Sequence, residues 1–292
     1  MGVPRRISLL RVALATSARW PQLAPEESSL IPELASRGLD ARPAVWSDPS
    51  IDWSQFDRVV IRSCWDYHRR LDEFLRWIHL VPSLCNPAHV IRWNSHKSYL
   101  LELAKKGVRI PRTALIRRGV ADDVDPAMTA GRLIVKPAVS ASAYETHLFD
   151  SFDEARGIID RLASDHDVII QEFVPEVVEE GEWSLIYFAR QFSHAVHKAP
   201  KSGDFRVQQE HGGSALHGKA SPGLVRAAES ALNMVEGELC YARVDLVDTS
   251  RGPLLMELEL IEPSLFLATD PDATRRFADA IVHAIPRAKS KR

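Results

Sequence analysis

The sequence Ala242-Arg243-Val244-Asp245, followed after a turn by Met256-Glu257-Leu258-Glu259-Leu260, places three carboxylates on two short apolar runs. Side chains alternate between the two faces of a strand, so Glu257 and Glu259 share one face and the hydrophobic residues around them share the other. The intervening segment 248–253 has the composition of a turn, which lets the two runs pair antiparallel with Asp245 opposite the glutamates. The sequence therefore predicts a β-hairpin with three carboxylates clustered on one face.

Two interpretations of this carboxylate cluster are open at the hairpin itself. Neighbouring carboxylates repel one another unless a cation joins them, and oxygen ligands without a nearby His or Cys suit Mg²⁺, which commonly bridges carboxylates to nucleotide phosphates. The alternative is a solvated acidic face, which antiparallel strand pairs often have. The rest of the chain favours the metal site, because it supplies lysines in positions suited to phosphate.

Composition limits the class of protein. The chain has 292 residues, 45% of them hydrophobic and 26% charged, which is enough for two domains or for one domain with subdomains. A net charge of −2 argues against nucleic acid as the main partner. The three cysteines are widely spaced and form no CxxC pattern, so neither a disulfide framework nor a zinc site is supported, and a cytoplasmic location is expected.

The N-terminal residues contain arginines followed by an apolar run, a pattern that superficially resembles a secretion signal. Arg11 interrupts this run, so we interpret residues 11–16 as a first buried strand and expect no targeting segment. No stretch reaches the roughly 18 apolar residues that a membrane span requires, and no membrane partner is expected. The sequence leaves open whether the protein forms a homo-oligomer.

Residues 30–38 predict a helix closed by a glycine, and strands are predicted over 41–46 and 58–62. Alternating strands and helices indicate a parallel sheet, whose binding residues lie on loops beyond the carboxyl ends of its strands. An arginine at the start of such a loop suits carboxylate recognition. The alternative is packing, with Arg62 paired to Asp66 and two aromatic rings anchoring the next helix. The predicted substrate residues in this loop are Arg62, Ser63, Trp65, Asp66 and Tyr67.

A first cation suited to phosphate lies near a predicted amphipathic helix over residues 98–106, which Asn94 or Ser95 would cap. Lys97 would then lie in the first turn, where a positive charge gains nothing from the helix dipole. A ligand anion nearby explains a lysine in this position more easily. A short strand is predicted to follow over residues 108–116.

A second lysine ends the buried apolar strand predicted over residues 133–137, and a lysine in that position needs a partner. After Lys136 the chain enters a loop of small residues, 138–144, in which backbone N–H groups and the hydroxyls of Ser140 and Ser142 can approach phosphate oxygens closely. The alternative is a plain surface loop beside a lysine that extends into solvent.

Two further segments have polar residues at the end of a strand. Residues 167–175 predict a buried strand whose polar end suits adenine binding through the backbone. Residues 182–189 and 192–198 predict a hairpin, followed by a loop rich in glycine, serine and charge. The cations Lys198, at the end of this hairpin, and Arg206, on the mobile loop, can clamp a phosphoryl group during its transfer, and Arg206 is preferred for that role. The alternative is a surface arginine.

In their order and spacing these motifs resemble the ATP-grasp superfamily, of the glutathione-synthetase and RimK-like type, over about residues 85–270. Further segments at 62–67, 93–94, 204–206 and 257–264 are similar to the group of O-ureido-D-serine cyclo-ligases, the D-cycloserine synthetase type. The residues that carry the superfamily resemblance are Lys97, Lys136-Pro137, Gln171-Glu172-Phe173-Val174 and Asp245 with Glu257-x-Glu259.

The resemblance implies a fold and a set of site residues. The implied fold is α/β (α+β), an ATP-grasp protein with a parallel α/β domain at 1–90 and two ATP-grasp subdomains, 91–175 and 176–292, that clasp ATP. The implied ATP-binding residues are Lys97, Lys136, Ser140, Ser142, Glu172, Phe173 and Val174, with Glu176 or Glu179 on the ribose. The implied magnesium ligands are Asp245, Glu257 and Glu259, and Glu262 is a further metal or substrate contact.

This chain departs from the family pattern at two places. Most relatives carry Asn at the position of Glu259, and their phosphate loop is rich in glycine where residues 138–144 carry Ala and Ser. A glutamate at position 259 adds negative charge to the cluster, so its role differs from that of the asparagine.

The implied activity is that of an ATP-dependent carboxylate–amine ligase that uses ATP and Mg²⁺. The γ-phosphoryl group passes to a substrate carboxylate and a nitrogen attacks the resulting acyl phosphate, with Lys198 and Arg206 as the predicted catalytic residues. The implied substrate is a small amino-acid derivative, including one that closes on itself as O-ureido-D-serine does to give D-cycloserine. The alternatives are a RimK-like ligase that adds amino acids to a peptide or protein and a regulatory ATP-binding protein without turnover.

Overall fold

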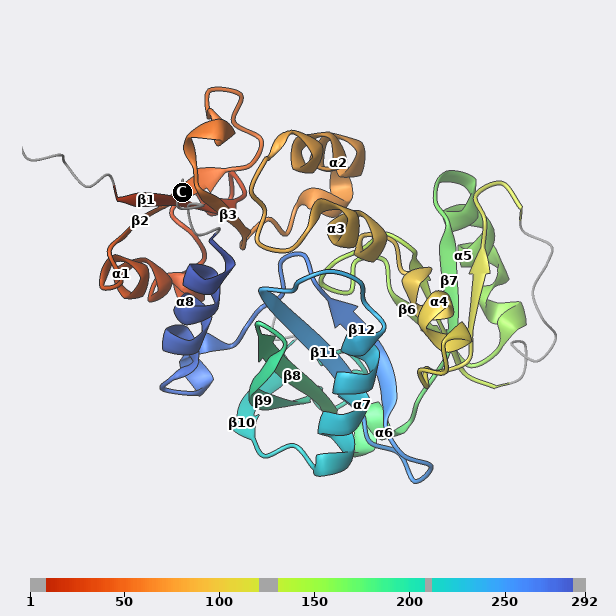
Figure 1. The fold of residues 1–292 in the computed structure, drawn as a ribbon. Coiled ribbons are helices and arrows are strands. Elements are labelled where there is room, and N and C mark those ends of the chain that lie inside the picture. Colours follow the sequence, from red (N-terminus) through yellow and green to blue (C-terminus); the bar gives the residue numbers. More distant parts are fainter. Residues whose placement is uncertain (1–8, 121–130, 208–211, 286–292) are drawn as a thin grey trace, which may run out of the picture.

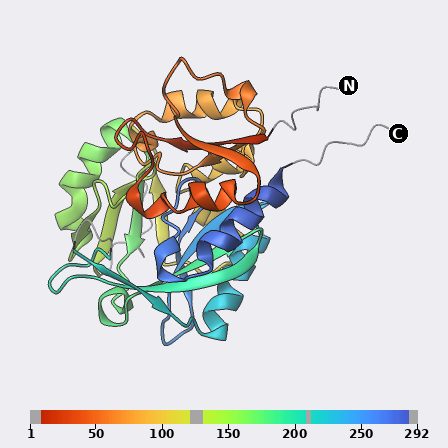
Figure 2. The same ribbon diagram turned by 90° about the vertical axis from the view of Figure 1, so that its left-hand side faces the viewer.

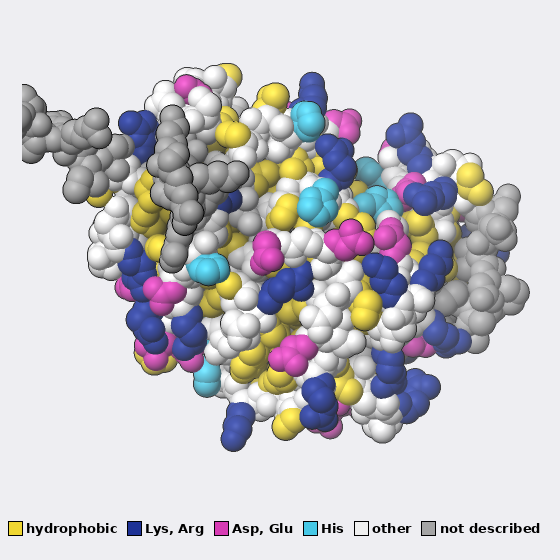
Figure 3. All heavy atoms as spheres, viewed as in Figure 1, with side chains coloured by type: hydrophobic (Ala, Val, Ile, Leu, Met, Phe, Trp, Pro, Cys, Tyr) yellow, Lys and Arg dark blue, Asp and Glu magenta, His cyan; other side chains and the backbone are white. Residues whose placement is uncertain are grey.

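The structure is a computed structural model that describes residues 9–120, 131–207 and 212–285. Three β-sheets follow one another along the chain (Figure 1). None of the helices within these ranges has the length and apolar character needed to cross a membrane. On the face shown in Figure 3, basic and acidic side chains are interspersed, in agreement with a net charge of −2.

The first sheet consists of three parallel strands in the order β2-β1-β3, which confirms the predicted parallel sheet. Its central strand β1 is covered on both faces, so its side chains alternate between two apolar cores. One core includes α1 and the C-terminal helix α8, and the other includes α2. The elements are β1 (Leu10–Thr16), α1 (Leu30–Ala35), β2 (Leu39–Val45), β3 (Arg58–Ile61), α2 (Leu71–Leu80) and α3 (Ala88–Asn94), with 3-10 turns at Pro25–Glu27, Trp53–Gln55 and Tyr67–Arg69.

The second sheet is antiparallel, with the order β4-β7-β5-β6, and α5 packs on it through a core of aliphatic residues. Ser151 caps α5 by accepting a hydrogen bond from the backbone N–H of Glu154. The predicted strand at 133–137 is confirmed as β5. The elements are α4 (Tyr99–Lys105), β4 (Thr113–Ile116), β5 (Leu133–Pro137), β6 (His147–Phe149), α5 (Phe152–Asp165) and β7 (Val168–Glu172).

The third sheet is also antiparallel, in the order β10-β9-β8-β11-β12, and α4 and α7 share an apolar core with it. Its strands β11 and β12 form the predicted carboxylate hairpin, with Asp245 paired to Glu257 and Arg243 paired to Glu259. The elements are α6 (Glu176–Glu179), β8 (Glu182–Phe188), β9 (Gln191–Ala199), β10 (Ser214–Gly218), α7 (Pro222–Asn233), β11 (Tyr241–Val247), β12 (Leu254–Glu259), a 3-10 turn at Leu267–Thr269 and α8 (Ala273–Ala284).

The C-terminal helix α8 returns to the start of the chain and lies beside α1 (Figure 2). Phe277 on α8 is fully buried and stacks on Phe188 of β8, with ring centroids 4.9 Å apart. It belongs to the same apolar core as Val12 and Leu14 of β1. The first and third sheets therefore share one core through α8, which fixes their relative position.

Two local predictions need correction. Asn94 and Ser95 do not cap the helix predicted at 98–106, because Asn94 ends a separate helix, α3, and Ser98 is the residue before α4. Lys97 therefore lies between two helices and not in a first helical turn. The strand predicted at 108–116 is limited to β4, and Pro111, which cannot donate a backbone hydrogen bond, lies in its irregular first part.

Candidate active site

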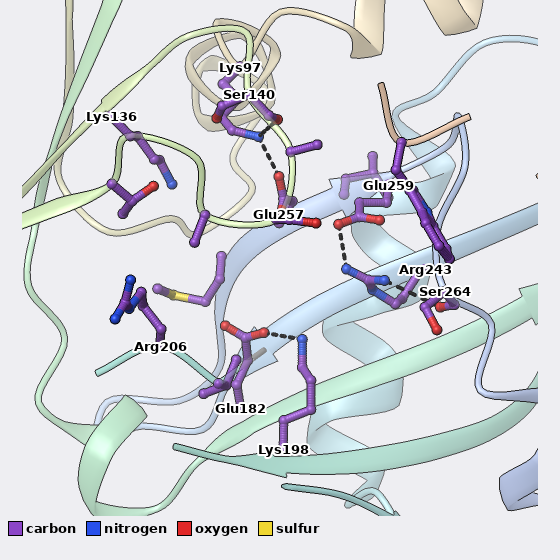
Figure 4. A pocket seen from close by; sticks show the side chains of 18 of the residues that line it. Lys97, Lys136, Ser140, Glu182, Lys198, Arg206, Arg243, Glu257, Glu259 and Ser264 are labelled. Carbon is purple, nitrogen blue, oxygen red and sulfur yellow. Dashed lines mark hydrogen bonds and ion pairs between the residues drawn. The ribbon is translucent and has the colours of Figure 1, made fainter. Parts of the chain in front are cut away.

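A cavity of about 470 Å³ lies where the three sheets meet, and each sheet or its loops contributes to the wall. Trp20 and Trp65 come from loops of the first sheet, Lys136 and Phe173 from the second, and Glu257 from the third. Figure 4 shows charged side chains of the second and third sheets and their flanking segments pointing toward one another across the cavity. A mixed polar and aromatic cavity of this size suits small-molecule ligands.

Asp245, Glu257 and Glu259 each direct one oxygen into a common space, and these oxygens lie within 4.8 Å of one another. The hairpin produces this cluster because all three residues lie on the same face of β11 and β12. Asp245 also accepts a hydrogen bond of 2.6 Å from the Ser184 hydroxyl of β8. Three hard oxygen ligands at this separation fit a Mg²⁺ ion.

Sequence reasoning missed Arg243, which lies in the middle of this cluster. Its guanidinium donates to Asp245 at 3.0 Å and forms an ion pair with Glu259 (Figure 4). The signal was present, because Arg243 is two residues from Asp245 and so lies on the same strand face. Glu182 was also missed: it lies opposite Lys198 in the β8–β9 register and forms an ion pair with it.

The environment shifts two pKa values of the cluster in opposite directions. Burial raises the pKa of Asp245, but Arg243 and Lys198 outweigh it and lower the value to about 2. Burial, together with the charges of Glu257 and Asp245, raises the pKa of Glu259 to about 8, although the charges of Arg243 and Lys198 oppose the shift. Two carboxylates of one cluster therefore differ in their affinity for a proton.

The two predicted phosphate-binding lysines both line the cavity. The Lys97 ammonium donates to Glu257 at 2.5 Å and to the Ser140 carbonyl at 3.2 Å, so the cation is paired with a predicted metal ligand. Lys136 has one hydrogen bond among the described residues, of 3.4 Å, to Gln171. Burial, together with the charge of Lys97, lowers the pKa of Lys136 to about 8.

The small-residue loop lies directly beside these lysines, and Ser140 and Ser142 both line the cavity. Ser142 and Ala143 have positive φ angles of 50° and 54°, a left-handed conformation that favours glycine. The loop thus keeps the backbone shape of a glycine-rich turn at the cost of local strain. Its tip residue Tyr144 packs its ring 5.5 Å from that of His68, in the first-sheet loop.

The predicted adenine residues Glu172, Phe173 and Val174 line the cavity. The Glu172 carboxylate is paired with Arg112, and the backbone N–H groups of Glu172 and Phe173 already donate to the carbonyls of Arg112 and Arg132, the residues just before β4 and β5. The two predicted ribose residues, Glu176 and Glu179, are not among the residues that line the cavity. Val177, between them on α6, is the residue of that helix that faces it.

The predicted position of Arg62 is wrong, because its side chain does not reach the cavity. Arg62 is fully buried and forms a two-bonded ion pair with Glu27, which is 1% exposed, and a hydrogen bond of 2.6 Å to the Pro263 carbonyl. The packing alternative had Asp66 as the partner, but Asp66 instead accepts a hydrogen bond from Trp46. Ser63 is also buried away from the cavity and accepts from the Ala24 backbone.

Other residues of the same loop do reach the cavity. Trp65 and Tyr67 line it together with Glu262, which sequence reasoning had given as a metal or substrate contact. Trp20 lies edge-on to Trp65, with ring centroids 6.5 Å apart, so the end of the cavity nearest the first sheet has an aromatic wall.

The predicted catalytic cations Lys198 and Arg206 both line the cavity. Lys198 is buried between Glu182 and Asp245. Arg206 is partly exposed and pairs with Asp204 of its own loop at 2.8 Å. Residues 208–211 of that loop lie outside the described residues.

Comparisons with known proteins agree with this geometry. Residues 93–279 match the family model of the RimK-like ATP-grasp domain, and residues 12–87 match that of the N-terminal domain of D-cycloserine synthetase DcsG. The chain is 30% identical to the cycloserine biosynthesis protein DcsG of Streptomyces lavendulae, over 94% of this chain and 98% of the relative. It is 28% identical to a probable alpha-L-glutamate ligase of Legionella pneumophila, over 53% of this chain and 51% of that protein.

Solved structures are similar over most of the chain. The crystal structure of D-cycloserine synthetase DcsG aligns with a TM-score of 0.85 at 28% identity, covering 94% of this chain and all of that one. A D-alanine–D-alanine ligase from Bacillus anthracis, complexed with ATP, aligns with a TM-score of 0.66 at 13% identity, covering 94% and 97% of the two chains, and shares the fold.

The three-sheet fold and its charged cavity define a ligase of the ATP-grasp class. The chain belongs to the RimK-like ATP-grasp family. It is an ATP-dependent ligase that forms carbon–nitrogen bonds and releases ADP, as the sequence predicted.

Proposed function

We propose that the enzyme closes a small amino-acid derivative on itself, and specifically that it converts O-ureido-D-serine to D-cycloserine. The observation that carries this proposal is the origin of the aromatic wall. Trp65 and Tyr67 belong to the segment that matches the DcsG N-terminal domain, so the part of the chain most specific to that group shapes the substrate end of the cavity. The overall reaction consumes ATP and water and releases ADP, phosphate, carbon dioxide and ammonia along with D-cycloserine.

The site residues take the following roles in this proposal. Lys97, Lys136 and the loop with Ser140 and Ser142 bind the ATP phosphates, and the segment from Glu172 to Val174 lines the adenine end. Arg206 and Lys198 stabilise the charge that develops on the transferred phosphoryl group. Arg243, which faces the carboxylate cluster, is positioned to stabilise the acyl phosphate and the oxyanion formed when nitrogen attacks it. Positioning and charge carry the reaction, and no covalent enzyme intermediate is needed.

We also propose that Glu257, Glu259 and Asp245 hold Mg²⁺. The support is the chemistry of the donor set: three carboxylate oxygens within 4.8 Å of one another, with no nitrogen or sulfur ligand in the group. A bound Mg²⁺ would neutralise charge on the nucleotide phosphates. The domain division implied by the family, at about residues 90 and 175, remains part of this proposal.

The test measures ADP release and D-cycloserine formation from O-ureido-D-serine and Mg-ATP, with Glu257→Gln as the inactive control. The native protein should release one ADP per D-cycloserine, and the control should bind ATP weakly and form no product while unfolding at the same temperature. ADP release that depends on peptides or amino acids, and not on O-ureido-D-serine, would assign the enzyme to RimK-like addition of amino acids. No ADP release with any acceptor would contradict the proposal entirely.

A further inference from the structure

The carboxylates that line the cavity differ in whether another residue holds them. The Glu262 carboxylate is 8% exposed and lines the cavity, yet it makes no hydrogen bond or ion pair with any residue in the three described ranges. Burying a carboxylate without a partner is costly, so such a group indicates a ligand. Each of the other lining glutamates has a partner: Glu26 with Ser264, Glu172 with Arg112, Glu182 with Lys198, Glu257 with Lys97 and Glu259 with Arg243.

The backbone around Glu262 is held with unusual completeness. Six consecutive backbone carbonyls, from Leu260 to Leu265, each accept a hydrogen bond from a side chain that lies outside this segment. A backbone fixed at every residue gives the Glu262 side chain a defined position before any ligand binds, which is the condition for an efficient catalytic group. The donors, in the order of the carbonyls they bind, are Asn86, Tyr241, Trp65, Arg62, Arg243 and His194.

The electrostatic surroundings of Glu262 place it between the aromatic wall and the reaction centre. Burial raises the pKa of Tyr67, and the negative charge of Glu262 raises it further. The Glu262 carboxylate therefore lies near Tyr67, at the substrate end of the cavity. Burial raises the pKa of Glu262 itself well above its ordinary value, and the charge of Glu259 adds to this, whereas Lys97 opposes it. When it is ionised, a carboxylate with a raised pKa is a stronger base than an ordinary one.

We propose that Glu262 accepts the proton of the substrate nitrogen that attacks the acyl phosphate, an inference that rests on the proposed function. In O-ureido-D-serine this nitrogen lies between an oxygen and a carbonyl carbon, and it is a poor nucleophile while it keeps its hydrogen. In the step, the bond between nitrogen and the acyl carbon forms, and the bond from that carbon to the phosphate oxygen breaks. Phosphate leaves with the electron pair, the proton passes to the Glu262 carboxylate, and the carbamoyl group stays on the nitrogen.

Hydroxylamine separates this role from simple binding. It is largely unprotonated at neutral pH and attacks acyl phosphates without a base, giving a hydroxamate that can be measured by its colour with iron. Glu262→Gln should reduce D-cycloserine formation about 100-fold or more, while hydroxamate formation from O-ureido-D-serine, ATP and hydroxylamine stays within about threefold of the native rate. Glu262→Asp, which withdraws the carboxylate by one methylene, should lose less D-cycloserine formation and keep hydroxamate formation.

Each alternative outcome is distinct. Equal losses of both products in a folded Glu262→Gln protein would overturn the proposal, because they would show that Glu262 acts in substrate binding or in formation of the acyl phosphate and not on the attacking nitrogen. Unchanged D-cycloserine formation would also overturn it. Neither product from the native protein would overturn the proposed function first and this inference with it. Glu73→Gln, which removes an exposed glutamate of α2, is the matched control and should behave as the native protein in both assays.

Discussion

The Arg62→Ala substitution distinguishes a substrate-binding arginine from one that holds the fold. Arg62 and Glu27 are 0% and 1% exposed, so removing the guanidinium leaves a buried carboxylate without its counter-charge. Breaking a buried ion pair by removing one partner typically costs about 3–5 kcal/mol. The Pro263 carbonyl also loses its donor, which adds to the loss.

For a protein of this size, each kcal/mol lowers the unfolding temperature by about 2–4 °C, so the expected fall is on the order of 10 °C. Thermal unfolding followed by circular dichroism measures it directly. The double variant Glu27→Leu with Arg62→Met replaces the pair by apolar groups and should recover much of the loss, because the remaining charge is removed with its partner.

The contrary result is equally clear. An Arg62→Ala protein that unfolds at the native temperature, but needs far more substrate for half-maximal rate, would show that the guanidinium binds substrate in solution. That outcome would refute the buried pair as the reason for this arginine.

Three further predictions follow from the site. Burial and Lys97 lower the pKa of Lys136 to about 8, so the affinity for ATP should fall as the pH rises through that value. The Lys136→Arg variant stays charged and should not show this fall. Titrations with ATP at several pH values measure the affinity of both proteins. Asn86 makes four buried hydrogen bonds, so Asn86→Ala should lower the free energy of unfolding by about 2–4 kcal/mol in urea, and a loss below measurement error would contradict this. The cations and carboxylates of the cavity pair with each other. The affinity for ATP should therefore be about tenfold or more higher with Mg²⁺ than with EDTA, which removes the metal. Equal affinities would argue against the metal cluster.

The carboxylate hairpin was predictable because its signal is local. A period of two in hydrophobicity and a short turn fix both the strands and the face on which Asp245 and Glu257 meet, and the observed register agrees. Arg243 obeys the same rule and could have been identified from its position two residues before Asp245. Helix α5 also had a local signal, with Ser151 three residues before Glu154 and apolar residues at helical spacing, although it was not predicted.

The partner of Arg62 was not predictable in this way. Glu27 lies 35 residues earlier in the chain, on a 3-10 turn, and no periodicity connects the two positions. The nearer Asp66 looked like a suitable partner but is held by Trp46 on β2's continuation. Local pattern identifies which loop lies at a strand end, whereas the direction of each side chain in that loop depends on packing between distant segments.

Two buried or half-buried charged groups in the cavity lack an opposite charge at hydrogen-bond distance within the described part of the chain, and their positions divide the site. Lys136 has only the Gln171 amide oxygen, at 3.4 Å, and burial lowers its pKa; Glu262 has no such partner, and burial raises its pKa. Both shifts have the same cause, since a buried charge without compensation favours its neutral form. Lys136 lies beside the phosphate loop and Glu262 lies beside the aromatic wall. We therefore expect the nucleotide to interact with Lys136 and the substrate nitrogen to interact with Glu262. The other buried and half-buried charges of the cavity are held in ion pairs, with which ligands must compete. We therefore expect ligand binding at Lys136 and Glu262 to contribute most directly to the chemistry.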